Sequence, residues 1–216
     1  MRKFLLFGSI IGLLLQADAS QLGFIVLDLA SRTSGQLPAG WQIKVNHGRP
    51  NITIGRDPDG SFLHLKSVKS SFSLEREVDV DPAQMPLLTW RWKVAELPKG
   101  GDFRHSSTDD QAAQVMVAFT DRRVISYIWD TTAPRGTLEM ATSIPLVRIY
   151  ALVCQSGDAE MNRWLPESHN ILADYLRAYG KQPPHVKGLR LQINSQHTGS
   201  DAESYFGEVA FHSAQQ

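Results

Sequence analysis

The sequence has a single cysteine, Cys154, so the chain cannot form an internal disulfide. Its 22 basic and 22 acidic residues balance at pH 7. Domains that bind nucleic acids normally carry a basic field, so this balance argues against a nucleic-acid partner. Without disulfides, stability has to come from a hydrophobic core, and 216 residues are enough to build one.

Recognisable catalytic motifs are also missing. The sequence has no HExxH pattern, no CxxC pair, no glycine-rich phosphate loop and no Ser, His and Asp at triad spacing. Cys154 ends the apolar run from Leu146 to Val153, and a thiol in such a run is typical of a small buried hydrophobe rather than of a nucleophile. These absences favour a binding protein over an enzyme.

The N-terminal segment has the three parts of a secretory signal peptide. Met1-Arg2-Lys3 is a cationic head, an apolar run follows from Phe4 to Leu15, and Ala17-Asp18-Ala19 matches the A-x-A cleavage pattern. The apolar run is shorter than the roughly 20 residues that span a bilayer. We therefore expect residues 1–19 to be a signal peptide cleaved after Ala19, and residues 20–216 to form one periplasmic or secreted domain without a transmembrane anchor.

Apolar and polar residues alternate with a period of two along most of the remaining chain. Turn signals rich in Pro, Gly and Asp separate the alternating segments, a pattern typical of an antiparallel sandwich or barrel. We predict a mostly β fold, an antiparallel jelly-roll β-sandwich. Its predicted strands are Trp41–Val45, Ile52–Arg56, Phe62–Lys66, Phe72–Val78, Leu88–Val94, Ala112–Phe119, Val124–Trp129, Leu146–Val153, Leu189–Asn194 and Tyr205–Phe211.

One segment, residues 168–180, has helical spacing instead. Its apolar residues are Leu172, Tyr175, Leu176 and Tyr179. Ser168 is a suitable N-cap, and Gly180 is suited to end the helix. The sequence therefore predicts a single short helix across one end of the sandwich.

Three predicted strands have a second face with hydrogen-bonding side chains. Successive side chains of a strand point to opposite faces, which in 146–153 assigns Val147, Ile149, Ala151 and Val153 to the core. The hydrogen-bonding residues on the second faces are Gln114, Arg148, Tyr150, Arg190, Gln192 and Asn194. If the three strands share a sheet, these residues line a groove suited to sugar hydroxyls. The alternative is an ordinary solvated sheet face.

Aromatic residues and one histidine add to this site. Trp90 and Trp92 share a strand face with Leu88 and Val94, which predicts core positions for both. Trp129 lies near the end of a strand that is apolar on both faces and is the best aromatic candidate for stacking on a ligand. His197, in a loop, is either a base or ligand at the groove or an ordinary solvated histidine.

Asp109 and Asp110 stand together at the start of a predicted strand, where Asp is depleted. In a strand they point to opposite faces, so they cannot flank one scissile bond. With Asp102 from the preceding loop they are candidate ligands for a structural Ca²⁺, which accepts irregular oxygen cages. The favoured alternative is that Asp109 closes a turn and Asp110 begins the strand.

A series of short motifs covers residues 40–212. They are Leu88-Thr-Trp-Arg-Trp-Lys-Val94 with Leu97-Pro98, Asp109-Asp110-x-Ala-Ala113 ending at Phe119, Tyr127-x-Trp129, Ser156-Gly157, Trp164, Asp174-Tyr175, Tyr179-Gly180, Pro183-Pro184, Thr198-Gly199 and Tyr205-Phe-Gly-Glu-Val-Ala-Phe211. On these motifs the chain resembles the domain-of-unknown-function 3047 family of bacterial exported proteins. The resemblance implies a jelly roll similar to galactose-binding and carbohydrate-binding modules, without an established activity.

The chain departs from that family at one segment. Where members commonly have Asp-x-Asp-Asn-Thr-Gly, this sequence has Asn194-Ser-Gln-His-Thr-Gly199. Both acids are amides here, so a cation site in relatives would be lost or replaced by a site for a polar ligand.

These observations favour an exported, non-catalytic module that binds a glycan or another cell-envelope component. Arg148, Tyr150, Gln192 and Asn194 would supply directional contacts, and Trp129 a stacking ring. One alternative is a polysaccharide-active enzyme, either a glycosidase or a lyase in which Tyr150 or His197 abstracts a proton. A second alternative is a structural or partner-binding envelope protein.

Overall fold

The computed structural model describes residues 23–29, 37–141 and 147–214. The predicted signal peptide, residues 1–19, lies outside the described residues, and so does Leu146 at the start of one predicted strand. Among the helices of the described part, none is long and apolar enough to cross a membrane.

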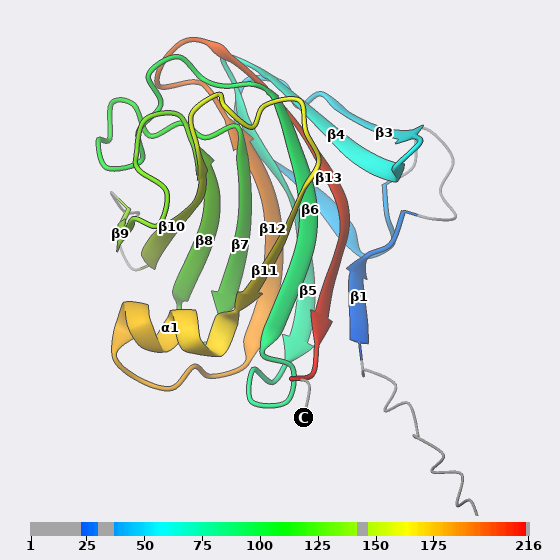
Figure 1. Ribbon diagram of the computed structural model, residues 1–216, viewed down its shortest axis with the longest axis vertical. Helices are drawn as coiled ribbons and strands as arrows, with labels where there is room; N and C mark the ends of the chain where they lie inside the picture. Colours follow the sequence, from blue (N-terminus) through cyan, green and yellow to red (C-terminus); the bar gives the residue numbers. More distant parts are fainter. Residues whose placement is uncertain (1–22, 30–36, 142–146, 215–216) are drawn as a thin grey trace, which may run out of the picture.

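Two β-sheets pack against each other as a sandwich (Figure 1). The first has six strands: β1 (Gly23–Leu27), β3 (Ile52–Asp57), β4 (Gly60–Val68), β6 (Leu87–Glu96), β11 (Leu165–Asn170) and β13 (Asp201–His212). The second has seven: β2 (Trp41–His47), β5 (Ser71–Val80), β7 (Ala113–Phe119), β8 (Arg123–Asp130), β9 (Leu138–Met140), β10 (Arg148–Ser156) and β12 (Val186–Asn194). The predicted mostly β sandwich is confirmed.

The strand order brings distant segments of the chain together. The first sheet runs β11-β6-β13-β4-β3, with β1 also paired to β13, and the second runs β2-β5-β12-β7-β8-β10-β9. All described pairs are antiparallel except β8 with β10, which is parallel. The prediction of purely antiparallel sheets is wrong for this pair. Between β8 and β10 the chain forms β9, which runs antiparallel to β10, so β10 starts again at the same end of the sheet as β8. Parallel neighbours require the chain to return in this way.

Period-two alternation builds the core between the sheets. Along β6, Leu88, Trp90, Trp92 and Val94 are buried, whereas the residues between them are only partly so. Trp90 is 3% exposed and Trp92 is 0% exposed, and their rings meet edge to face with centroids 5.4 Å apart. The predicted core positions of both tryptophans are confirmed.

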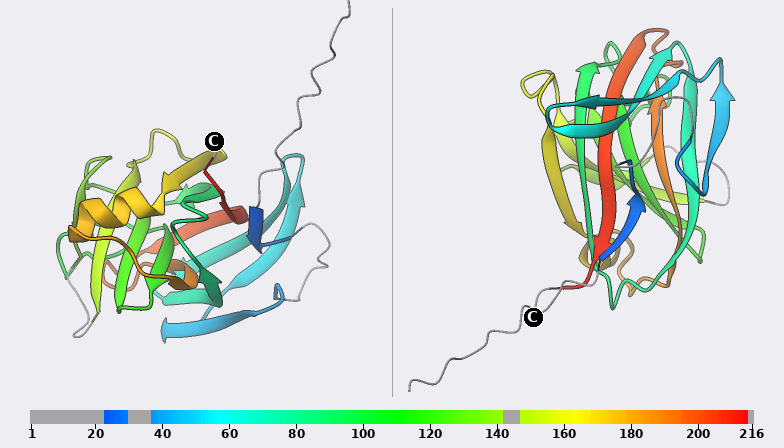
Figure 2. Two further views of the ribbon diagram at one scale, coloured as in Figure 1. Left: turned by 90° about the horizontal axis from the view of Figure 1, so that it is seen from below. Right: turned by 90° about the vertical axis from the view of Figure 1, so that its right-hand side faces the viewer.

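The single helix, α1 (Ile171–Tyr179), lies across the ends of strands at one end of the sandwich (Figure 2). Gly180 ends it as predicted, with φ of 69° and its N–H donated to the Leu176 carbonyl. The N-cap is Asn170 and not the predicted Ser168, because Ser168 still belongs to β11. Asn170 Oδ1 accepts a hydrogen bond from the Ala173 N–H at 3.0 Å.

The two faces of β10 are exchanged relative to the prediction. Leu152 and Cys154 lie in the main core, whereas Ile149 and Ala151 line a hollow on the outer side of the sheet. Both faces of β10 are apolar, so alternation does not determine its register. Its outer side packs in a second, smaller core formed by Phe103, Ile128, Ala133, Ala151 and Val153.

Candidate functional site

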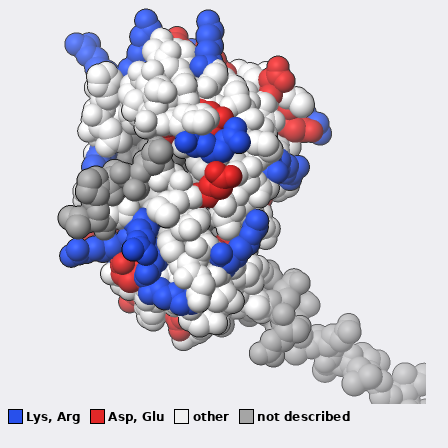
Figure 3. All heavy atoms as spheres, turned by 90° about the vertical axis from the view of Figure 1, so that its left-hand side faces the viewer, with Lys and Arg blue, Asp and Glu red and all other residues white. Residues whose placement is uncertain are grey.

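The outer face of the seven-stranded sheet forms a groove with a volume of about 960 Å³. The side chains that line it come mainly from β2, β5, β12, β7, β8 and β10, together with the loop before β7. Its size lies in the range of typical ligand pockets. On the face of the molecule in Figure 3, basic and acidic side chains are interspersed among uncharged ones.

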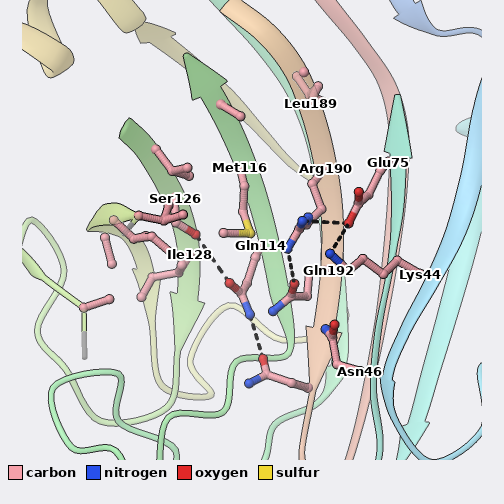
Figure 4. A pocket seen from close by; sticks show the side chains of 18 of the residues that line it. Lys44, Asn46, Glu75, Gln114, Met116, Ser126, Ile128, Leu189, Arg190 and Gln192 are labelled. Carbon is pink, nitrogen blue, oxygen red and sulfur yellow. Dashed lines mark hydrogen bonds and ion pairs between the residues drawn. The ribbon is translucent and has the colours of Figure 1, made fainter. Parts of the chain in front are cut away.

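One half of the groove is polar and crosses three neighbouring strands (Figure 4). Arg190 Nη2 lies 2.7 Å from Glu75 Oε1, which also lies 4.0 Å from Lys44 Nζ. Arg190 Nη1 donates to Gln192 Oε1 at 3.5 Å. These side chains face the groove because Leu189, Leu191 and Ile193 alternate with them and are buried in the core. We call Lys44, Glu75, Arg190 and Gln192 the polar row.

The polar row offers hydrogen-bond donors and acceptors that are partly exposed to solvent. About a third of the Glu75 side chain is exposed, as is about a quarter of the Arg190 side chain. The Lys44 side chain is more than half exposed. Arg190 and Lys44 both stand near the single carboxylate of Glu75, so the positive charges are partly compensated within the row.

Asn194 lines the groove, but its hydrogen-bonding capacity is used within the protein. Its Oδ1 accepts from the Gln111 N–H at 3.1 Å and from Gln114 Nε2 at 2.6 Å. Its Nδ2 donates to the Asp109 carbonyl at 2.6 Å and to Asp110 Oδ1 at 3.2 Å. A side-chain amide has two donors and two acceptor positions, so Asn194 holds the loop against β12 and has no bond left for a ligand.

The other half of the groove is apolar. Its lining includes Phe103, Met116, Ala118, Val124, Ile128, Val147, Ile149 and Ala151. Phe103 is the only aromatic residue in the described lining, and it is buried. Aliphatic side chains therefore form the apolar surface that a ligand would meet.

The structure brings together only some of the predicted ligand residues. Gln192 and Asn194 line the groove. Arg148 and Tyr150 alternate with Ile149 and Ala151, so they face away from it, and the Tyr150 ring packs against Tyr179 of α1 at 5.1 Å. The lyase alternative needs Tyr150 at the groove, but Tyr150 and Gln192 lie on opposite faces of the sheet.

Trp129 and His197 also lie outside the groove lining. Trp129 is fully buried in the main core, and its Nε1 donates to the Gly157 carbonyl at 3.0 Å. It therefore has no exposed face for stacking on a ligand. His197 is exposed, with Nδ1 3.0 Å from the Asp109 carbonyl oxygen.

The three aspartates predicted to bind a cation have separate protein partners. Asp102 Oδ2 forms an ion pair with Arg104 Nη2 at 2.6 Å and accepts from Thr132 Oγ1 at 2.9 Å. The hydrogen bond from Arg104 is the main cause that holds the pKa of Asp102 far below its ordinary value. The fully buried Asp110 accepts from the Thr198 N–H at 2.6 Å. Among the described residues, these carboxylates do not form a shared ligand set.

Asp109 differs from the other two because it lines the groove. Burial is the main cause that raises its pKa, and the negative charge of Asp110 adds to the increase. A hydrogen bond from Gln111 Nε2 at 3.0 Å and the charge of His197 act in the opposite direction. The result is a carboxyl group at the groove that keeps its proton at a higher pH than an ordinary aspartate.

Several groove residues were not predicted from the sequence. Gln42, Lys44 and Asn46 of β2 and Glu75 of β5 all line it. Their alternation with apolar residues is visible in the sequence and predicts only that they face outward. That Lys44, Glu75 and Arg190 form one row depends on the strand order β2-β5-β12, which no local pattern contains.

A family model described as a protein of unknown function, DUF3047, matches residues 39–210, nearly all of the sandwich. The chain belongs to the DUF3047 family. The search of curated proteins gave no match.

Solved structures share the sandwich of this DUF3047 protein. The xyloglucanase domain of NopAA from Sinorhizobium fredii, in complex with cellobiose, is 8% identical, with a TM-score of 0.50 over 92% of this chain and 100% of that one. Endoglucanase Cel12A from Rhodothermus marinus is 8% identical, with a TM-score of 0.50 over 88% and 99%. The xylan-binding module CBM15 is 10% identical, with a TM-score of 0.45 over 91% and 99%. At these identities the first two establish a shared fold.

Proposed function

We propose that this DUF3047 protein is an exported, non-catalytic module whose groove binds a glycan or another hydroxyl-rich component of the cell envelope. The observation that carries the proposal is the polar row, which places an amide, a guanidinium and a carboxylate across adjacent strands of one groove. A sugar hydroxyl both donates and accepts hydrogen bonds, so a mixed row of this kind can bind several hydroxyls of one chain.

The charge balance of the row favours a neutral ligand over a polyanion. Arg190 forms an ion pair with Glu75 at 2.7 Å, and the whole sequence carries no net charge at pH 7. The aliphatic half of the groove would contact the apolar face of a sugar ring. The fold is consistent with this function, since a structure of similar fold holds cellobiose, although fold alone does not determine function.

The proposed affinity is modest, because most hydrogen bonds to the ligand replace hydrogen bonds to water. A glycan array followed by calorimetry on positive glycans tests it. The double variant Arg190→Ala, Gln192→Ala should weaken binding at least about tenfold, the effect of losing about 1.4 kcal/mol. Arg163→Ala is the matched control, because it removes an exposed arginine paired with Glu160 at 2.6 Å, outside the groove lining.

The control should bind like the native protein. The proposal is wrong if the native protein binds no glycan, or if the double variant binds as tightly as the control. In either case the polar row is an ordinary solvated face, and a structural or partner-binding role in the envelope becomes the better explanation.

A second candidate function, a glycosidase, is favoured by one specific observation. Asp109 lines the groove and burial raises its pKa, which is the property that a general acid needs. A glycosidase also needs a second carboxylate facing the same space, and Glu75 and Glu77 both line the groove. Release of reducing ends from envelope and plant polysaccharides, abolished in Asp109→Asn but kept in the exposed control Asp59→Asn, would establish this alternative.

Export is part of the proposed function and has its own test. Intact-mass analysis of protein recovered from the periplasm or the medium should give a chain that begins at Ser20. Recovery of the chain with residues 1–19 still attached would contradict the proposed cleavage.

A further inference from the structure

A second group of polar side chains lies between the two sheets, apart from the groove. It consists of Cys154 on β10 of the seven-stranded sheet and of Glu167 and His169 on β11 of the six-stranded sheet. One ligand atom from each residue lies within 4.8 Å of the other two. Among the residues that the structure describes, this is the only set of three such ligands.

Two of the three distances between these atoms match those around one tetrahedral zinc ion. Cys154 Sγ lies 3.4 Å from His169 Nε2, and His169 Nε2 lies 3.6 Å from Glu167 Oε2. Zinc bonds are about 2.3 Å to sulfur and about 2.0–2.2 Å to nitrogen and oxygen, so tetrahedral ligand atoms stand about 3.3–3.6 Å apart. The ligand atoms of Cys154 and Glu167 lie within 4.8 Å of each other, so binding one ion would require this pair to close by at most about 1 Å.

Neighbouring groups already orient the histidine as in a metal site. Its second nitrogen, Nδ1, lies 3.4 Å from Asp174 Oδ2, which also accepts a hydrogen bond from the Tyr127 hydroxyl at 2.9 Å. The imidazole lies nearly parallel to Trp90, with centroids 5.3 Å apart. A carboxylate on the outer nitrogen of a metal-bound histidine fixes its tautomer and its ring orientation.

The carboxylate of the cluster is oriented as well. Gln155 Nε2 donates to Glu167 Oε1 at 2.7 Å, while Oε2 is the oxygen near His169. The Glu167 side chain is only 8% exposed, and Cys154 is 4% exposed. Burying a carboxylate is costly unless it is paired or bound to a cation; His169 pairs with this one, and a divalent ion bound to both side chains would replace that pairing.

We propose that Cys154, Glu167 and His169 bind one Zn²⁺ ion, with Asp174 and Gln155 as positioning residues. Thiolate and imidazole ligands select zinc over the hard cations Ca²⁺ and Mg²⁺. Three protein ligands leave a fourth coordination position for water, as in zinc sites that are not closed. This site does not depend on the function proposed for the groove.

The position of the site gives the ion a structural effect. Cys154 and His169 belong to different sheets, so the metal would connect the two layers of the sandwich at the side where β10 and β11 face each other. An ion that binds only the folded chain stabilises it by mass action. The melting temperature of the native protein should therefore rise when Zn²⁺ is added.

Cobalt spectroscopy on the chelator-treated native protein tests the ligand set directly. Co²⁺ should produce a near-ultraviolet thiolate-to-cobalt band and the visible bands of a tetrahedral ion, saturating at one ion per chain. Zn²⁺ should displace the cobalt. Competition with a chromophoric chelator then gives the zinc affinity of each variant.

The expected loss of zinc affinity differs between substitutions of a ligand, of a positioning residue and of the control residue. Cys154→Ser should abolish the thiolate band and lower zinc affinity more than about 100-fold, while Asp174→Asn should lower it about 10–100-fold. The control His185→Asn removes an exposed histidine that is paired with Asp79 at 2.7 Å and does not belong to the ligand set. It should bind zinc like the native protein.

The proposal is overturned if native protein with Co²⁺ shows no thiolate band, or if Cys154→Ser binds zinc with native affinity. The first measurement needs no mutation, so it decides the question even if a variant fails to fold. A zinc-induced rise in melting temperature that persists in Cys154→Ser would also place the ion elsewhere.

Discussion

Replacing Glu203 with glutamine tests how strongly one hydrogen-bonded carboxylate on the six-stranded sheet stabilises the fold. Glu203, on β13, accepts hydrogen bonds from the Tyr205 hydroxyl at 2.6 Å and from Lys66 Nζ at 2.9 Å. His64 Nε2 lies 2.9 Å from its Oε1. Burial alone would raise the pKa of Glu203, but these three partners outweigh it and lower the pKa to about 2 from an ordinary 4.5.

The sign of the pH effect follows from this difference. Because the pKa is lower in the folded state, the stabilisation is fully present above the unfolded pKa of 4.5 and is lost as the pH falls toward 2. The difference corresponds to about 3 kcal/mol at pH 7, of which about 2 kcal/mol is lost by pH 3. The Glu203 side chain is only 18% exposed, but its partner Lys66 is 38% exposed, so solvent screening makes about 3 kcal/mol an upper bound.

Urea unfolding at pH 7 and at pH 3 measures the effect. Glu203→Gln should be less stable than the native protein at pH 7, and its free energy of unfolding should fall by about 2 kcal/mol less between the two pH values. Glu208→Gln is the control, because Glu208 is exposed on the same strand. If Glu203→Gln shows the same pH dependence as the native protein, the carboxylate is not stabilised as described.

Three further substitutions probe packing, capping and loop geometry. Trp92→Ala should lower the free energy of unfolding by about 3–5 kcal/mol, because the ring is fully buried; a small loss in urea unfolding would contradict the core assignment. Asn170→Ala should cost about 1 kcal/mol by removing the N-cap of α1, and an unchanged melting temperature would count against that cap. Gly101→Ala should destabilise by about 1–3 kcal/mol, since its Cβ would lie 2.4 Å from the Asp110 carbonyl oxygen; native stability would show that the loop shifts freely.

Much of the fold could be predicted because the alternation along individual strands is clear. The four buried residues of β6 all occupy the predicted face. Gly180 ends the helix as predicted, because the last position needs a left-handed backbone conformation that glycine adopts easily. By contrast, β11 was not predicted. Its sequence, Leu-Pro-Glu-Ser-His-Asn, contains a proline and no apolar alternation, which is acceptable because the strand lies at a sheet edge.

The candidate site was predicted correctly only where the alternation along a strand is clear. Gln114 and Gln192 lie opposite each other on paired strands, and both strands alternate clearly. Arg148 and Tyr150 were placed on the wrong face because β10 is apolar on both sides and its register shifts between Val153 and Gln155. The contact between Cys154 and His169 joins two sheets, so no local pattern could have shown it.

The position of β13 has a consequence for when the protein can fold. It is the last strand of the described chain, yet it lies between β6 and β4 and also pairs with β1, the first strand (Figure 1). A nascent chain therefore lacks a central strand of this sheet until β13 has been made. Domains generally fold as units, so we expect the sandwich not to close before β13 is available. Such a delay would suit the proposed export, in which the chain crosses the membrane before it folds.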